Sequence, residues 1–374
     1  MNKRLKIVLV CSYPPPYAGM SIYAERFSAY LNARGHSCEV IDIGREKRRR
    51  KAEHVLAPWG GRFLKYLSTV NIVRRGCPDV LQIACSSYGN LHGSLLIAVF
   101  AKYMGIPTVF SIRGGSFPER AASLGFLSRR FVRWALSFPN HFICVNERIG
   151  SAIESLGVPD WKTSIIPAFC LHYLKYSLKG DQLPQEIADF CASHNPVLVS
   201  GIVFERIYGW ETLLAAFAEL RALHQDAGLI IMGKGPDKTI CAEIVEKKSL
   251  SGSVLMPGDL PHPIALTICK ELADVMIRPT MVDGDSSFVR EGVALCKPVV
   301  ASDTDFRPEG VILFKIGDAS ELAEKVEYAL EHVDEIIAEL STIEHPDYFA
   351  KTVILYESVL SDSSRSKAPG EVND

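Results

Sequence analysis

The feature of the sequence that most constrains its fold is a regular alternation of short apolar runs with segments of helical periodicity. The runs of the first half lie at residues 6–10, 38–43, 79–83, 108–112, 142–146 and 164–167, and those of the second half at 196–201, 229–233, 254–258, 275–280, 298–302 and 311–314. Such runs are typical of parallel strands that helices cover on both faces. The sequence therefore predicts an α/β protein with two doubly wound, Rossmann-like sheets.

The domain boundaries follow from where this alternation stops. Residues 169–195 are rich in polar side chains and have no strand pattern, so we interpret them as a linker. This gives an N-terminal domain of residues 1–168 and a C-terminal domain of residues 196–342. Residues 343–360 have the pattern of a helix, which we expect to cross back to the N-terminal domain, and the polar residues 361–374 are expected to form a loose tail.

Charge and cysteine content narrow the class of protein. Residues 1–165 contain 23 Lys and Arg against 10 Asp and Glu, a net charge of +13, whereas the remainder has 18 against 33, a net charge of −15. This split favours two domains with different partners. No apolar stretch reaches the length of about 18 residues that a membrane-spanning helix needs. The ten cysteines include no C-x-x-C pair for zinc or redox chemistry, so we expect a cytoplasmic protein with reduced, buried thiols.

The segment VMIRPTMVDGDSSFVREGVALC, residues 275–296, predicts a strand, a loop and a helix. Backbone N–H groups and the positive end of the helix dipole then converge on one point, which suits a diphosphate. Glu291, early in the helix, would accept hydrogen bonds from ribose hydroxyls. Asp283, in the loop, would hold a sugar hydroxyl. The alternative is an acidic loop followed by an ordinary helix cap. The D-G-D letters are also similar to a metal-binding motif of another transferase fold, but nothing in the first half supports it, and we expect no metal ion.

Two doubly wound domains that face each other across a cleft would each offer a ligand-binding edge, because ligands bind beyond the carboxyl ends of the strands. This layout suits a two-substrate transferase, and it also suits a hinged binding protein. Six segments follow one another in a specific order: PPPYAG, RGHSCEVID, WETLLAAFAEL, IIMGKGP, LADVMIRPT and DGDSSFVREGVALCKPVVAS. On these segments the chain resembles the family 4 glycosyltransferases, retaining enzymes of the GT-B fold, of the bacterial surface-polysaccharide type.

The resemblance implies a set of site residues in the C-terminal domain. The family's E-x7-E motif matches Asp283 and Glu291, with the first carboxylate shortened to Asp. A UDP- or GDP-linked sugar is then the co-substrate, and no further cofactor is implied. Catalytic roles fall to Asp283, Arg206 and Lys234. The donor-binding residues would be Glu291, Gly201, Gly233, Gly284, Asp285, Ser286, Ser287, Phe288 and Arg290. By the same resemblance the departing phosphate oxygen takes the acceptor's proton, so no protein base is needed.

The sequence departs from the family at two cations. Family members carry an Arg and a Lys after the first strand of the second domain, and both hold the diphosphate. Here Ile202 stands in place of the Arg, and Ile207–Tyr208 stand near the Lys. Arg206 is the only cation of this loop and would substitute, unless it is a solvated loop residue. Arg278 and Arg290 are further candidates. The main alternative is therefore a catalytically inactive GT-B protein that binds a nucleotide sugar or partners an active transferase, and a sugar-nucleotide epimerase is the second.

In the N-terminal domain the resemblance implies an acceptor site. Gly19 opens the first helix after a proline-rich loop, and the segment VFSIRGGSF puts Arg113, Gly114 and Ser116 after the fourth of the predicted strands. The family often has a His where Arg113 stands. An arginine there would grip a phosphate or carboxylate of the acceptor. The alternatives are a structural ion pair for Arg113 and a rigid surface turn for the loop that precedes Gly19.

Two basic segments of the first half indicate a surface for an anionic membrane. Arg45–Lys51 has six cations in seven residues, and Pro118–Pro139 mixes arginines with aromatic side chains. Basic charge interleaved with aromatic residues suits an anionic bilayer, and a lipid-linked acceptor would place the protein at the inner face of the cell membrane. The alternative is a solvated loop and an ordinary half-buried helix. No nucleic-acid-binding motif is present, so no nucleic acid is expected as a partner.

Overall fold

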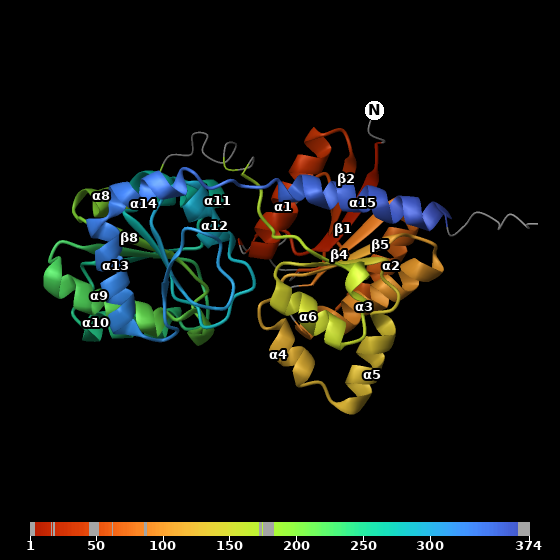
Figure 1. The fold of residues 1–374 in the computed structure, drawn as a ribbon, viewed down its shortest axis with the longest axis horizontal. Coiled ribbons are helices and arrows are strands. Elements are labelled where there is room, and N and C mark those ends of the chain that lie inside the picture. The colour runs from red at the N-terminus through yellow and green to blue at the C-terminus, as the bar shows by residue number, and fades with distance from the viewer. Residues whose placement is uncertain are drawn as a thin grey trace, which may run out of the picture. The chain divides into compact units, whose positions relative to one another are not determined.

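The computed structural model describes residues 4–15, 17, 19–44, 52–61, 63–85, 88–171, 174 and 183–365. The chain divides into two compact units (Figure 1). The first unit is Met1–Phe169 together with Asp347–Asp374, and the second is Cys170–Pro346.

The first unit is built on a parallel sheet flanked by helices. Within its described residues, seven strands pair in the order β3-β2-β1-β4-β5-β6-β7. The strands are β1 (Lys6–Cys11), β2 (Ser37–Asp42), β3 (Val55–Leu56), β4 (Val80–Cys85), β5 (Thr108–Ile112), β6 (His141–Cys144) and β7 (Thr163–Ile165). The helices are α1 (Gly19–Ala33), α2 (Leu64–Gly76), α3 (Tyr88–Tyr103), α4 (Phe117–Ala122), α5 (Phe126–Ala135), α6 (Glu147–Ser155), the short η2 (Asp160–Lys162) and α15 (Tyr348–Arg365).

The second unit repeats this architecture. Its described strands pair, again in parallel, in the order β10-β9-β8-β11-β12-β13. They are β8 (Val197–Gly201), β9 (Gly228–Met232), β10 (Val254–Gly258), β11 (Val275–Arg278), β12 (Val299–Ser302) and β13 (Ile312–Phe314). The helices are α8 (Gln185–Ala192), η3 (Arg206–Tyr208), α9 (Trp210–Leu223), α10 (Lys238–Lys247), α11 (His262–Thr267), the π-helical η4 (Ile268–Leu272), α12 (Ser287–Ala294), α13 (Ala319–Glu331) and α14 (Val333–Leu340).

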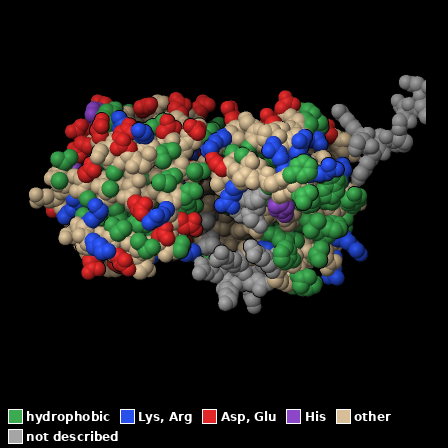
Figure 2. Space-filling view, turned by 90° about the horizontal axis from the view of Figure 1, so that it is seen from below, with side chains coloured by type: hydrophobic (Ala, Val, Ile, Leu, Met, Phe, Trp, Pro, Cys, Tyr) green, Lys and Arg blue, Asp and Glu red, His purple; other side chains and the backbone are tan. Residues whose placement is uncertain are grey.

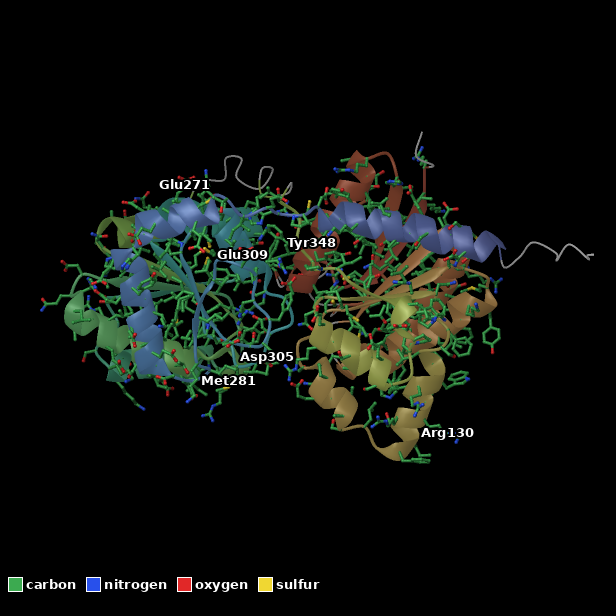
Figure 3. The ribbon with its side chains drawn as sticks, viewed as in Figure 1. Arg130, Glu271, Met281, Asp305, Glu309 and Tyr348 are labelled. Carbon is green, nitrogen blue, oxygen red and sulfur yellow. The ribbon has the colours of Figure 1, made fainter. Side chains whose placement is uncertain are left out.

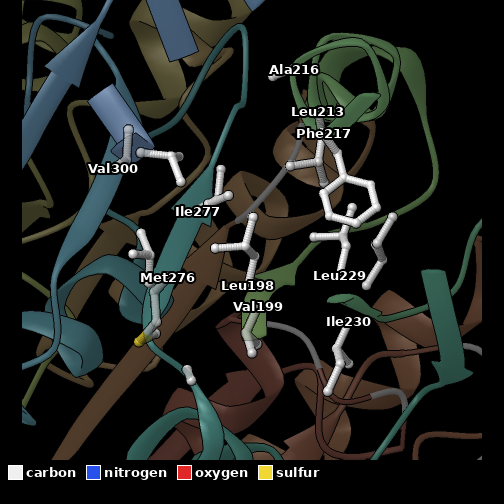
Figure 4. Close-up of a cluster of buried hydrophobic side chains, with 14 of the residues drawn as sticks. Leu198, Val199, Leu213, Ala216, Phe217, Leu229, Ile230, Met276, Ile277 and Val300 are labelled. Atoms are coloured by element: carbon white, nitrogen blue, oxygen red, sulfur yellow. The ribbon is translucent and has the colours of Figure 1, made fainter. Parts of the chain in front are cut away.

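Branched aliphatic side chains of the strands build the core of the second unit. Figure 4 shows Leu198, Ile230 and Ile277 of neighbouring strands with Phe217 of α9, and all four are buried. Burying each of these side chains stabilises the fold by about 1.5–3 kcal/mol. Gly292 lets α12 lie against this sheet, because an added Cβ would be 2.5 Å from a methyl of Val299. The missing side chain therefore allows close packing between α12 and the strands β11 and β12.

Helix α15 belongs to the first unit although it follows the whole of the second in sequence. The ring of Phe349 contacts the rings of Tyr23, Phe27 and Tyr30 at centroid distances of 4.9–5.6 Å. Asp347 accepts a hydrogen bond of 2.8 Å from the hydroxyl of Tyr30 just before the helix begins. The C-terminal segment is therefore a packed element of the first unit.

The structure differs from the sequence-based boundaries in three places. The predicted linker contains α8, whose Ile187 is buried in the second core. Helix α15 continues to Arg365, past the expected start of the loose tail, and residues 366–374 lie outside the described residues. Strand β3 was not predicted, because two residues are too few to show a periodicity.

Candidate active site in the second unit

The candidate site lies at the carboxyl edge of the second sheet, at its topological switch point. The strand order runs in opposite directions on the two sides of β8 and β11, and such points bind ligands in open α/β sheets. Gly201 ends β8 and Arg278 ends β11. Nη1 of Arg278 donates a hydrogen bond of 2.6 Å to the carbonyl oxygen of Gly201. The arginine thus bridges the two strands where they diverge.

Asp283 is held by a network of described side chains. Its Oδ2 accepts hydrogen bonds from Nε of Arg278 at 3.0 Å, Nη1 of Arg307 at 3.1 Å and Oγ1 of Thr280 at 3.2 Å. Its Oδ1 accepts from the backbone N–H of Gly284. Burial alone would raise the pKa of Asp283, but the positive charges of Arg278 and Arg307 outweigh it and lower the pKa below its ordinary value. Asp283 is therefore an anion that two cations clamp.

Arg307 is a member of this network that the sequence did not indicate. Its side chain is only 4 % exposed, and Nε donates to the carbonyl oxygen of Ser302 at 2.9 Å while Nη2 donates to the hydroxyls of Thr280 and Ser302. Its position five residues after the end of β12 could have indicated this role, because a cation that follows a buried parallel strand lies at the ligand-binding edge of the sheet.

Glu291, on α12, is buried and pairs with a second residue that the sequence did not indicate. Its Oε1 lies 2.9 Å from Nε2 of His262, the first residue of α11. Both side chains are almost completely buried. Glu291, the residue that we predict to bind the ribose, is thus oriented by the neighbouring imidazole of His262.

The entry to α12 matches the predicted strand, loop and helix. Ser286 is the N-cap, and its Oγ accepts a hydrogen bond from the backbone N–H of Val289. Asp285 accepts a hydrogen bond of 2.5 Å from Nε of Arg290, so this arginine is already paired. The ring of Phe288 covers Gly201 closely enough that an added Cβ would lie 2.9 Å from it. Ser287, the first helical residue, follows the cap directly.

The two cations expected to neutralise the diphosphate lie at the same edge, in the loops after β8 and β9. Arg206 is 77 % exposed and lies 3.6 Å from Glu211. Lys234 pairs with Asp259. Gly233, which precedes it, has a positive φ of 130°, and an added Cβ would overlap the carbonyl oxygen of Ile202. A side chain is excluded there, so the two loops pack directly on each other.

The predicted acceptor residues lie at the carboxyl edge of the first sheet. The guanidinium of Arg113 lies 3.6 Å from the centroid of the Tyr23 ring, and neither its Nε nor its Nη1 has a hydrogen-bond acceptor among the described residues although both atoms are buried. Gly114 and Ser116 form the turn that leads into α4. Gly19 begins α1. The basic segment Arg45–Lys51 lies outside the described residues.

The described part of the chain contains no group of three or more His, Cys, Asp or Glu side chains placed to hold a metal ion. None of its helices combines the length and the apolar character that crossing a membrane requires.

Comparison with known proteins identifies the fold and then the family. Solved structures match nearly the whole chain. HepE of Anabaena, solved with UDP and glucose, has a TM-score of 0.69 at 14 % identity, covering 98 % of this chain and 100 % of that one. The lipopolysaccharide outer core galactosyltransferase WaaB has a TM-score of 0.59 at 13 % identity, covering 97 % and 100 %. Sucrose-phosphate synthase of Thermosynechococcus elongatus has a TM-score of 0.68 at 15 % identity, covering 97 % and 98 %. The two parallel α/β sheets therefore form a GT-B fold.

The family models cover both units. Residues 17–169 match the model described as Glycosyltransferase Family 4, and residues 192–340 match the model described as Glycosyl transferases group 1. No curated protein sequence matches the chain. The chain belongs to the family 4 glycosyltransferases, as its sequence motifs predicted.

Proposed function

We propose that the protein is a retaining glycosyltransferase that moves a sugar from a UDP- or GDP-linked donor to a glycan or lipid-linked acceptor in surface-polysaccharide synthesis. The observation that carries this proposal is the convergence of Asp283, Arg278 and the start of α12 on the switch point of the second sheet, with Glu291 on the same helix. The neighbours HepE, solved with UDP-glucose, and WaaB, a lipopolysaccharide galactosyltransferase, are consistent with a nucleotide-sugar donor and a surface glycan.

The proposed chemistry needs charge stabilisation more than a protein base. The bond between the sugar's C1 and the diphosphate oxygen breaks, and the acceptor hydroxyl forms a bond to C1 on the same face. The acceptor's proton passes to the departing phosphate oxygen. Cations and backbone N–H groups held beside a departing phosphate stabilise the charge that develops on its oxygens. In this proposal they act without a metal ion, and Arg206 and Lys234 supplement them from the loops after β8 and β9.

A binding experiment tests the donor site. UDP, GDP and ADP are titrated against the protein, and a ligand at 100 times its Kd should raise the free energy of unfolding by about 2.7 kcal/mol. Glu291→Gln should weaken binding of that nucleotide about 10- to 100-fold, because it removes a charged acceptor for the ribose hydroxyls. Glu246→Gln, at an exposed position of α10, is the matched control and should bind as the wild type does. Unchanged affinity in Glu291→Gln contradicts the ribose role.

A catalytically inactive nucleotide-sugar-binding protein is the second candidate. It is favoured by the burial of Ile202 at the position of the expected Arg and by the exposure of Arg206, which pairs with Glu211. Incubation with radiolabelled nucleotide sugars and acceptor extracts distinguishes the two candidates. Release of nucleoside diphosphate with transfer of the label supports the enzyme, and binding without release supports the inactive protein.

On the acceptor side, we propose that Arg113 binds an anionic group, a phosphate or a carboxylate. The two buried nitrogens of Arg113 that have no acceptor among the described residues are costly, and an anion would satisfy them. Arg113→Gln should raise the KM for the acceptor and leave the affinity for nucleoside diphosphate unchanged. A variant with an unaltered acceptor KM would exclude this role.

We also propose that α5 contacts an anionic membrane. Phe126 and Leu127 are each 79 % exposed and lie beside Arg130, which points outward in Figure 3. Figure 2 shows hydrophobic and basic side chains gathered on the same face of the first unit. Such a face suits an interface of anionic headgroups and acyl chains. The protein should sediment together with phosphatidylglycerol vesicles. Equal binding to phosphatidylcholine vesicles, which carry no net charge, would contradict a contribution of the basic side chains to membrane binding.

A further inference from the structure

Arg278 is fixed at one side of its guanidinium and unbonded at the other. Nε is bound to Asp283 and one N–H of Nη1 to Gly201, and the structure gives Nη2 no acceptor within the described residues. The side chain is 11 % exposed, so it is largely desolvated. Its Cζ lies 5.2 Å from the ring centroid of Tyr208, beside which it is held. A rigid guanidinium with spare donors at a switch point is prepared for an anion.

The ion pairs around Arg278 contain one cation more than they contain anions. Arg278 and Arg307 share one carboxylate, that of Asp283, and these three side chains are 4–13 % exposed. The adjacent acid, Asp285, is already matched by Arg290. These five largely desolvated side chains carry a net charge of +1, which favours a ligand of opposite charge because a desolvated charge without a partner is costly.

We propose that Arg278 binds the phosphate oxygens of the donor's diphosphate, and that Asp283 and Arg307 are positioning residues that hold it. This inference rests on the proposed function, and it changes the role of one residue in it. Oδ2 of Asp283 already accepts hydrogen bonds from Arg278, Arg307 and Thr280, so this carboxylate orients a cation more than it orients a sugar. Tyr208 stands near the position at which family members carry a Lys. In this proposal Arg278, at the end of the neighbouring strand β11, supplies that positive charge.

The first experiment compares ligands with and without the diphosphate. The affinity of the full-length protein is measured by calorimetry for UDP and GDP and for uridine and guanosine. Arg278→Gln should weaken binding of the preferred nucleoside diphosphate about 10- to 100-fold and leave binding of its nucleoside unchanged. Arg278→Lys, which keeps the charge but loses the fork of donors, should give an intermediate value.

The control has the same change of charge at the opposite edge of the sheet. Arg221→Gln, whose guanidinium donates to the carbonyl oxygen of Ala227 before β9, should bind like the wild type. If Arg278→Gln binds nucleoside diphosphate as tightly as the control, the inference is overturned and the proposed function stands. If the wild type binds neither UDP nor GDP, the proposed function and the inference fall together.

The second experiment separates positioning from sugar binding. Asp283→Asn should weaken nucleoside diphosphate and the matching sugar nucleotide by the same factor, because both depend on Arg278. A loss confined to the sugar nucleotide, or no loss, overturns the positioning role. If Asp283→Asn does not fold, Thr280→Val removes one hydrogen bond to Asp283 and should give a smaller loss that is again equal for both ligands.

Discussion

The carboxyl edges of the two sheets hold partly buried arginines in opposite ways. In the first unit, Arg113 lies against the face of Tyr23, and its buried nitrogens have no acceptor among the described residues. In the second unit, Arg278 and Arg307 share the carboxylate of Asp283. An aromatic face attracts a cation without using its N–H donors, whereas a carboxylate uses them. The edge of the first sheet therefore leaves buried N–H donors of Arg113 without acceptors in the described part of the chain, whereas the edge of the second sheet fixes the orientation of Arg278 and Arg307.

The loops that follow the first strand of each sheet differ as well. Gly209 is the N-cap of α9, has a φ of 69°, and an added Cβ there would overlap the carbonyl oxygen of Pro279. Gly19 begins α1, and no described atom lies within 4 Å of the position of an added Cβ. As far as the described residues show, the same turn of the architecture is tightly packed in the second unit and has open space around Gly19 in the first.

The largest expected effect tests the contrast between paired and unpaired arginines. Arg307→Met should lower the free energy of unfolding by about 3 kcal/mol, because it removes the hydrogen bonds that this buried guanidinium donates to Asp283, Thr280 and Ser302. Arg113→Met should change it by less than about 1 kcal/mol, since the lost contact with Tyr23 is offset by removal of an unpaired buried charge. Urea unfolding of both variants is the measurement. Equal losses of stability in Arg307→Met and Arg113→Met would contradict the contrast between the paired and the unpaired arginine.

The second prediction concerns the two glycines. Gly209→Ala should destabilise the protein by about 2 kcal/mol, because its backbone conformation is strained for a residue with a Cβ and the carbonyl of Pro279 leaves no room. Gly19→Ala should be neutral or stabilise by less than about 1 kcal/mol, as alanine favours a helix. Thermal melting checks both, and a destabilised Gly19→Ala would show that the first loop is as tightly packed as the second.

The smallest expected effect is a loss of folding stability at acidic pH. The pKa of Asp283 lies below its ordinary 3.8 in the folded protein, so its contribution to stability is complete above that value and is lost as the pH falls through the folded pKa. Between pH 6 and about pH 3 the wild type should therefore lose more stability than Asp283→Asn does. Urea midpoints at the two pH values measure this. Parallel losses in the two proteins would mean that the arginines do not lower the pKa of Asp283.

The sequence predicts the sheets well because their signal is local. Continuous apolar runs indicated twelve of the described strands, and the DGDSS loop followed by FVREGVALC indicated the entry to α12. Asp283 and Glu291 could be singled out because turn residues and a helix start surround them. Their partners could not, because no local pattern connects Arg307 to Asp283, 24 residues apart, or His262 to Glu291, 29 residues apart. Long-range pairing depends on which strand ends meet at one edge.

The placement of α15 has a consequence for how the protein is made. The first unit lacks this helix, and with it the partner of the Tyr23, Phe27 and Tyr30 rings, until translation has passed through the entire second unit. Domains generally fold as the chain leaves the ribosome, in order of synthesis. Here this order is reversed, because the second unit is completely synthesised before the first unit is. Until α15 has been synthesised, the aromatic side chains that it covers in the first unit remain exposed.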